Sequence, residues 1–174
     1  MKTIKLKISI PDEWRALIES DQRIYSSCVR YSFNRLKEGI PIKNVYNDCI
    51  HKFKLGSHFI NCANREAKGI INRFKELPKY HFGGKALSKL YKGLISKEEY
   101  KKARNLGLFS EGEAIFKGNR YFKIDLQNKT IIYTRSRKEH IQLKINQWIR
   151  DKQLKILESI HICMENRVCP ITFK

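Results

Sequence analysis

The stretch MKTIKLKISI at residues 1–10 determines how the rest of the chain must be organised. Isoleucine or leucine at positions 4, 6, 8 and 10 alternates with lysine or serine, and this period of two is typical of a half-buried strand. A lone strand is not stable in water. We therefore expect residues 2–10 to pair with strands drawn from residues 120–145, which makes the helices predicted between residues 11 and 78 an insertion into a β-domain.

Strand patterns return in the last third of the chain. Residues 122–126 alternate apolar with polar side chains, residues 130–135 can form the return strand after a turn, and residues 141–145 alternate again. Pro170 to Lys174 begins another strand. A strand that starts so late suggests a truncated larger protein, or else a short sheet edge.

Three helices are predicted after the first strand. The first extends from Asp12 to about Leu36, either continuous or broken near Ser20, and the second covers about residues 41–53. The third, at about residues 58–77, has the most regular pattern, because its apolar residues recur at spacings of three and four. A last helix is predicted far along the chain, at about residues 146–166.

Residues 79–117 differ in composition, because they are rich in Gly and Lys and lack a long apolar period. We interpret them as a loop-rich excursion with one or two short helices. The clearest is Ser96 to Arg104, where Ser96 and Glu99 have the spacing of a capping box. The expected class is therefore α+β, with a β-domain made of residues 1–10 and 115–174 and an inserted helical lobe with a basic loop at residues 11–114.

The chain has 36 Lys and Arg against 17 Asp and Glu, a formal net charge of +19. Such an excess destabilises an isolated domain by self-repulsion unless a polyanion neutralises it, and nucleic acid is the commonest polyanion. A highly charged but merely soluble surface is the alternative. A membrane partner is disfavoured, because neither a long amphipathic helix nor a lipidation signal is evident. With no signal peptide either, we expect a cytoplasmic protein.

The cysteines predict neither a disulfide framework nor a metal site. They are odd in number, widely spaced and without a CxxC pair: Cys28, Cys49, Cys62, Cys163 and Cys169. His161, Cys163 and Cys169 could supply three metal ligands, but His161 and Cys163 would face different sides of a helix. We expect buried, reduced thiols, and no metal or cofactor.

A row of amide and cationic side chains follows the third predicted helix at spacings of four, three, four and three: Asn61, Arg65, Lys68, Asn72 and Lys75. Asn and Arg can make bidentate hydrogen bonds to base edges in a major groove. The row is therefore a candidate surface for reading nucleic acid, although simple solvation is the default for a polar helix face.

Two further candidates lie in the predicted β-domain. The first is a strand entry that combines phosphate-binding donors with a ring able to stack on a base: Lys117, Asn119, Arg120 and Tyr121. The alternative is a turn before a core strand. The second is a basic segment with neighbouring hydroxyl donors, suited to a phosphate backbone: Arg135, Arg137 and Lys138. The alternative is a solvated hairpin loop.

No nucleotide-binding, zinc-protease or hydrolase motif occurs in the sequence. Metal-dependent nucleases need several carboxylates that converge on their ions. Here the acidic residues are sparse and mostly lie beside Lys or Arg, as at Lys97-Glu98-Glu99. We therefore expect no catalytic residue and no enzymatic activity in this chain.

Four segments carry a family resemblance: RYSFNRL at 30–36, ANREAK at 63–68, LFSEGEA at 108–114 and GNR at 118–120. In this order, and over most of the chain, they resemble transposon-encoded TnpB proteins and their type V CRISPR relatives. The resemblance implies a first strand, an inserted helical recognition lobe, and a return that completes a small antiparallel wedge β-barrel of OB-like type. In that family a RuvC nuclease domain follows. Neither it nor the zinc-binding cysteines of the family are present in this sequence.

The resemblance implies that the barrel and its basic loops hold guide RNA, while the recognition helices contact target DNA. It adds Asn64, within ANREAK, to the candidate contacts on the third helix. The RuvC part would then be a missing C-terminal portion, and the chain either an excised fragment or a natural truncation. Three alternatives remain open: a stand-alone RNA- or DNA-binding regulator derived from a decayed nuclease, a small basic enzyme, and a basic protein-interaction module.

Overall fold

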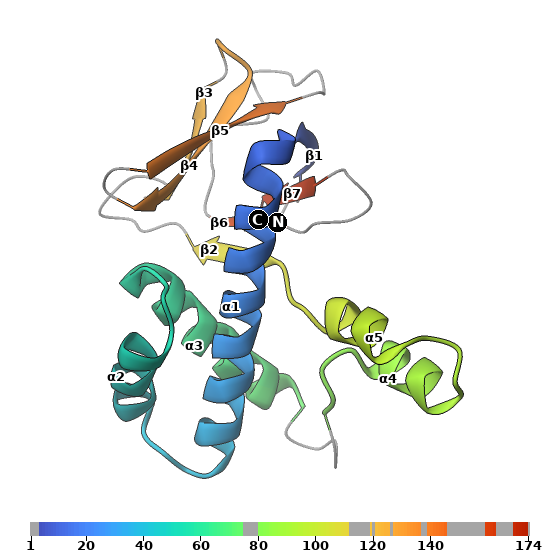
Figure 1. The fold of residues 1–174 in the computed structure, drawn as a ribbon. Coiled ribbons are helices and arrows are strands. Elements are labelled where there is room, and N and C mark those ends of the chain that lie inside the picture. The colour runs from blue at the N-terminus through green and yellow to red at the C-terminus, as the bar shows by residue number, and fades with distance from the viewer. Residues whose placement is uncertain are drawn as a thin grey trace. The chain divides into compact units, whose positions relative to one another are not determined.

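The computed structural model describes residues 4–74, 80–111, 119, 121–125, 127–136, 139–145, 159–162 and 169–173. These residues form an α+β structure, as expected (Figure 1). The chain divides into two compact units, which we call the β-unit, Met1–Asp21 with Gly107–Lys174, and the helical unit, Gln22–Leu106. From the sequence, we predict these boundaries at residues 10 and 115. The first boundary lies later in the structure because the beginning of the first helix belongs with the strands.

The β-unit is built on a sheet whose described pairings are all antiparallel. Its strands are β1 (Ile4–Ser9), β2 (Leu108–Glu111), β3 (Phe122–Asp125), β4 (Thr130–Ser136), β5 (Glu139–Ile145), β6 (Ser159–Ile162) and β7 (Cys169–Phe173). They follow the order β2-β6-β7-β1-β5-β4-β3. Ile8 of β1 lies opposite Ile145 of β5, while β1 pairs on its other side with β7. The predicted pairing of the N-terminal strand with a strand from residues 120–145 is confirmed.

The sheet has two ends, β2 and β3, and within the described residues these strands do not pair with each other. The closed barrel is therefore not confirmed. A side chain joins the two ends instead. The Asn119 amide, just before β3, donates from Nδ2 to the Ser110 carbonyl of β2 at 2.9 Å, and its Oδ1 accepts from the Ser110 hydroxyl at 3.0 Å.

Two strands contradict the sequence-based expectation. The helix predicted at 146–166 is wrong at residues 159–162, which form β6 and pair with both β2 and β7; the rest of that range lies outside the described residues. The sequence SIHI alternates apolar and polar residues, so its two β-branched isoleucines fit a strand once partners exist on both sides. Strand β2 lies in the excursion expected to hold only loops and short helices. β7 is flanked by β6 and β1, so it is not a sheet edge.

The helices are α1 (Asp12–Lys37), α2 (Ile42–Lys52), α3 (Ser57–Arg73), α4 (Gly84–Tyr91) and α5 (Lys97–Ala103). Helix α1 is continuous, without the break considered near Ser20 (Figure 1). It ends at Gly39, whose φ of 83° lets the amides of Gly39 and Ile40 donate back to the carbonyls of Leu36 and Arg35. The capping box predicted for α5 is confirmed, with Ser96 and Glu99 bonded reciprocally.

The core of the helical unit lies between α1, α2 and α3. Its buried side chains include Tyr25, Cys28, Val29, Val45, Cys49, Phe59, Ala63, Ala67 and Ile70. The Tyr25 hydroxyl donates to the Glu66 carboxylate at 2.7 Å, and burial together with this carboxylate raises the pKa of Tyr25. Ser26 on α1 holds the segment after α5, because its hydroxyl donates to the Leu106 carbonyl and accepts from the Leu106 amide.

Asp21 connects the first part of α1 to the sheet of the β-unit. Its carboxylate, 2% exposed, accepts from Arg135 Nε at 2.8 Å, from Arg135 Nη2 at 3.1 Å and from the Tyr133 hydroxyl at 3.1 Å. The Tyr133 ring stacks on Phe122 with centroids 4.9 Å apart. Burial and the Asp21 charge raise the pKa of Tyr133, and the hydrogen bond to Asp21 raises the pKa of Arg135. These contacts explain why α1 continues through this position.

None of the helices in the described part of the chain combines the length and the apolar composition that crossing a bilayer requires.

Replacing Asp21 with Asn should lower the free energy of unfolding by about 2–3 kcal/mol, because Arg135 then loses its buried charged partner and keeps only the more exposed Glu139. Asp12→Asn is the matched control, since Asp12 pairs with Arg15 on the same helix but is 98% exposed. Chemical denaturation should show no measurable change for this control. If both variants lose the same free energy of unfolding, the ion pair between Asp21 and Arg135 does not stabilise the fold in the way described.

Candidate nucleic-acid interface

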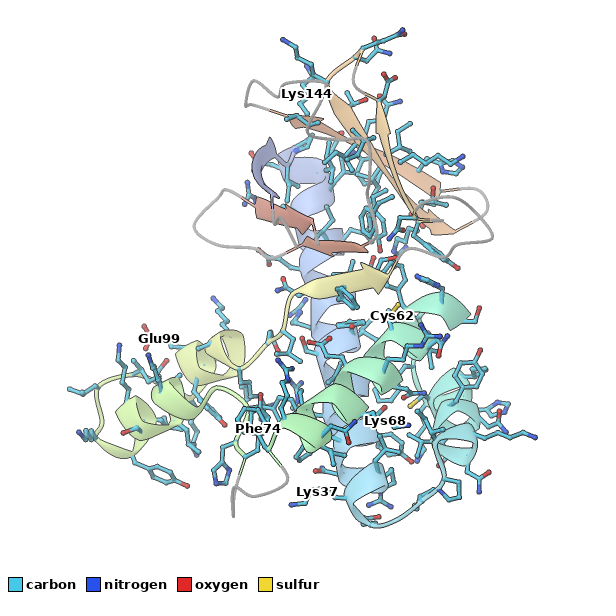
Figure 2. All side chains as sticks on the ribbon, turned by 180° about the vertical axis from the view of Figure 1, so that it is seen from behind. Lys37, Cys62, Lys68, Phe74, Glu99 and Lys144 are labelled. Atoms are coloured by element: carbon cyan, nitrogen blue, oxygen red, sulfur yellow. The ribbon has the colours of Figure 1, made fainter. Side chains whose placement is uncertain are left out.

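Helix α3 presents two distinct faces. Phe59, Ala63, Ala67 and Ile70 are buried in the core of the helical unit. The polar row predicted from the sequence is exposed along the rest of the helix: Asn61, Arg65, Lys68 and Asn72. Lys68 is labelled on this helix in Figure 2. Lys75 lies outside the described residues. Because these residues recur every three or four positions, α3 presents amide and guanidinium donors in one line.

Asn64 does not belong to this row. It is 1% exposed, and its Oδ1 accepts from the Ser32 hydroxyl on α1 at 2.5 Å. The prediction of a direct nucleic-acid contact by Asn64 is therefore corrected to a packing role between helices. The sequence contained a signal for this, because residue 64 stands four after Ile60 and three before Ala67, on the apolar face.

The strand entry before β3 is organised by Asn119. Its Oδ1 accepts from the backbone amides of Tyr121 at 3.0 Å and Phe122 at 3.1 Å, in addition to its bonds with Ser110. Tyr121 is half-buried. Lys117 and Arg120 lie outside the described residues. The Asn119 amide thus shapes the turn itself, which favours the alternative of a turn before a core strand.

Arg135 is not a freely available phosphate ligand. Its guanidinium donates to Asp21 through two nitrogens and to Glu139 Oε2 through Nη1 at 2.8 Å, and its side chain is 31% exposed. A phosphate would have to compete with two carboxylates. Arg137 and Lys138 lie outside the described residues. The sequence analysis did not identify Asp21 as the partner of Arg135. The available signal was that Asp21 is an acidic residue among the apolar positions of a long helix.

The positive charge is unequally divided between the two units. The helical unit contains 19 Lys and Arg against six Asp and Glu, a net charge of +13. The β-unit contains 17 against 11, a net charge of +6. Internal ion pairing can neutralise a larger share of the cations in the β-unit, as it does for Arg135. The helical unit therefore presents the stronger positive field to a polyanion.

A second exposed feature of the helical unit was missed by the sequence-based search. Helices α4 and α5 form a short hairpin (Figure 1), and its turn exposes Tyr91 and Leu94, which are 82% and 69% exposed. Lys85, Lys89 and Lys92 are also exposed there. An aromatic ring among lysines is a composition that suits base stacking beside a phosphate backbone.

The described residues contain no group of three or more His, Cys, Asp or Glu side chains arranged to hold a metal ion. Cys28, Cys49 and Cys62 are buried free thiols, as predicted. The groups that the helical unit exposes include hydrogen-bond donors, an excess of cations and the ring of Tyr91. Together they can bind a polyanion and stack on a base.

Comparison with protein families gives a match over nearly the whole chain. Residues 1–171 match the family described as the SSO2105 N-terminal domain. The chain belongs to this family. The match extends through both compact units, so the helical insertion is part of the SSO2105 N-terminal domain and not an addition peculiar to this chain. Neither a curated protein nor a solved structure matches the chain.

The contrast between Asn64 and Asn61 can be tested by alanine substitution. Asn64→Ala should lower the free energy of unfolding by about 1–3 kcal/mol, because the buried hydrogen bond between Ser32 and Asn64 is lost and the removed amide leaves a cavity. Asn61→Ala removes the same group from the exposed face and should change stability by less than about 0.5 kcal/mol. Urea unfolding of both variants gives the comparison, and equal stability would show that Asn64 is not a packing residue.

Proposed function

We propose that this chain binds nucleic acid and forms the non-catalytic half of an RNA-guided endonuclease of the TnpB or type V CRISPR kind. In this proposal it holds guide RNA and contacts target DNA in the cytoplasm. Cleavage belongs to a RuvC part outside this sequence. The chain itself needs no cofactor and performs no chemistry.

The observation that carries the proposal is the exposed row on α3 within a unit of net charge +13. Polyanion binding relieves the repulsion among these cations and releases counterions from the phosphates. Asn61 and Asn72 at the ends of the row add groups that both donate and accept. Such amides can read the adenine edge, which offers both a donor and an acceptor, whereas cations only donate.

Two further observations support the more specific assignment. The N-terminal strand pairs with β5 and β7, and five helices intervene between β1 and β2. This order agrees with the wedge domain and inserted recognition lobe that the TnpB resemblance implies; closure of the sheet into a wedge barrel is part of the proposal. The family description, an N-terminal domain, also suits the front part of a longer nuclease.

The alternative readings make different predictions. A regulator derived from a decayed nuclease would bind nucleic acid but act without a RuvC partner. A basic protein-interaction module would not bind nucleic acid at moderate salt. The exposed row on α3 favours the nucleic-acid readings over the last one.

The purified chain should bind structured RNA with strong salt sensitivity and should cut neither RNA nor DNA in the presence of magnesium. If about six phosphates are contacted, raising salt from about 50 to about 200 mM should weaken affinity roughly a thousandfold. Filter binding across a salt series, with a parallel cleavage assay, measures both properties. Salt-independent binding would remove the electrostatic basis of the proposal, and metal-dependent cleavage would show an active site in the chain.

Replacing Arg65 and Lys68 together with Ala should weaken binding to DNA or an RNA–DNA duplex more than binding to RNA. Each lost phosphate contact should reduce the slope of log affinity against log salt by about one unit. Lys43→Ala with Lys54→Ala is the matched control, because both side chains are exposed in the same unit and the same charge is lost. Equal losses in the two double variants would indicate a general electrostatic surface and not a reading helix.

A further inference from the structure

Two arginines that are far apart in the sequence come together in the helical unit. Arg30 lies on α1, one turn after Ser26, and Ser26 bonds both backbone groups of Leu106. Arg104 caps the C-terminus of α5, two residues before Leu106. The Ser26 hydrogen bonds therefore hold the segment that contains Arg104 against the part of α1 that contains Arg30.

These guanidinium groups differ from the ion-paired arginines of the same structure. Arg30 Nη2 donates to the Ser27 hydroxyl at 2.9 Å, but its Nη1 is buried without a hydrogen-bond partner. The Nε of Arg104 is also buried without a partner, and its guanidinium lies over the Tyr100 ring, 5.7 Å from the centroid. Within the described residues, neither arginine pairs with a carboxylate, whereas Arg15, Arg35 and Arg135 do.

This arrangement is electrostatically unfavourable in the unbound protein. Burial and the neighbouring Arg104 charge lower the pKa of Arg30. Two like charges that are partly removed from water, with buried N–H groups lacking acceptors, require an explanation. An anionic ligand at the accessible guanidinium nitrogens supplies the missing negative charge together with acceptor oxygens.

The backbone around Arg104 is constrained. Gly83, at the start of α4, has a φ of 69°, and a Cβ added there would lie 3.0 Å from the Cα and Cβ of Arg104. The close approach of Gly83, the ring of Tyr100 and the bonds to Leu106 restrict where the Arg104 side chain begins. A positioned guanidinium loses less conformational entropy when it binds an oxyanion.

We propose that Arg30 and Arg104 form a clamp for one phosphate group, and that its ligand is a phosphodiester of the bound nucleic acid. Guanidinium groups bind phosphate oxygens through parallel N–H donors, and two of them can share the non-bridging oxygens of one phosphodiester, whose negative charge offsets part of theirs. The clamp deepens the proposed function, on which its assignment to nucleic acid rests. A free phosphate compound would present the same chemistry, so the experiment separates the two sources.

The variants are Arg30→Gln, Arg104→Gln, their combination, and Arg30→Lys, which keeps the charge but removes the planar fork. Lys43→Gln is the control, because it removes one exposed charge from α2 in the same unit. Circular dichroism establishes that each variant is folded. Should a Gln variant fail to fold, Arg30→Lys is compared with the unaltered chain. This variant retains the positive charge on α1, and we expect it to bind pyrophosphate more weakly.

The first measurement is the melting temperature in pyrophosphate against sodium chloride of equal ionic strength. Pyrophosphate should raise it for the unaltered chain and for Lys43→Gln, but not for either arginine-to-Gln variant. The second is filter binding of a structured RNA across a salt series. Each Gln variant should lose about one unit of slope, and the double variant should lose no more than a single one, because both arginines hold the same phosphate.

RNA binding that is unchanged in the arginine variants would overturn the clamp and leave the proposed function standing. A second outcome is that the chain binds no nucleic acid but is stabilised by pyrophosphate through both arginines. This result would support a clamp for a free phosphate compound and would overturn the proposed function. If the chain neither binds nucleic acid nor is stabilised by pyrophosphate, both the clamp and the proposed function are overturned.

Discussion

The backbone hydrogen bonds of the N-terminal strand are the constraint on which the architecture depends. β1 is the central strand of the sheet order and pairs with β7 on one side and β5 on the other. A strand from the beginning of the chain can occupy this place only if the later strands assemble around it. The segment between β1 and β2 is consequently an insertion, and its larger part, Gln22–Leu106, folds as a unit with its own core between α1, α2 and α3.

Charge is handled differently in the two units. In the β-unit, Asp21 and Glu139 engage Arg135, so a basic residue that the sequence offers for binding instead stabilises the fold. The helical unit has only six acidic residues for 19 cations, and Glu66, one of the six, accepts a hydrogen bond from Tyr25. Most of its positive charge cannot be neutralised internally. This imbalance is the physical basis on which we propose a polyanionic partner.

The candidate contacts therefore fall into two kinds. The row on α3 is exposed along the helix. Arg30 and Arg104 are partly buried and close to one another, so a bound anion would offset the repulsion between their charges. A surface of the first kind attracts nucleic acid broadly, whereas a site of the second kind holds one phosphate at a defined position and so sets the register of the ligand.

Local patterns in the sequence were sufficient for β1, for the capping box of α5 and for the exposed row of α3. Each depends on residues a few positions apart, whose alternation or helical spacing is visible without tertiary contacts. Tertiary partners decided the rest. SIHI becomes β6 because two strands lie beside it, Asn64 is buried because Ser32 faces it, and Arg135 is engaged because Asp21 approaches from α1. The proximity of Arg30 and Arg104 has no local signal in the sequence, since hydrogen bonds between Ser26 and Leu106 bring those distant segments together.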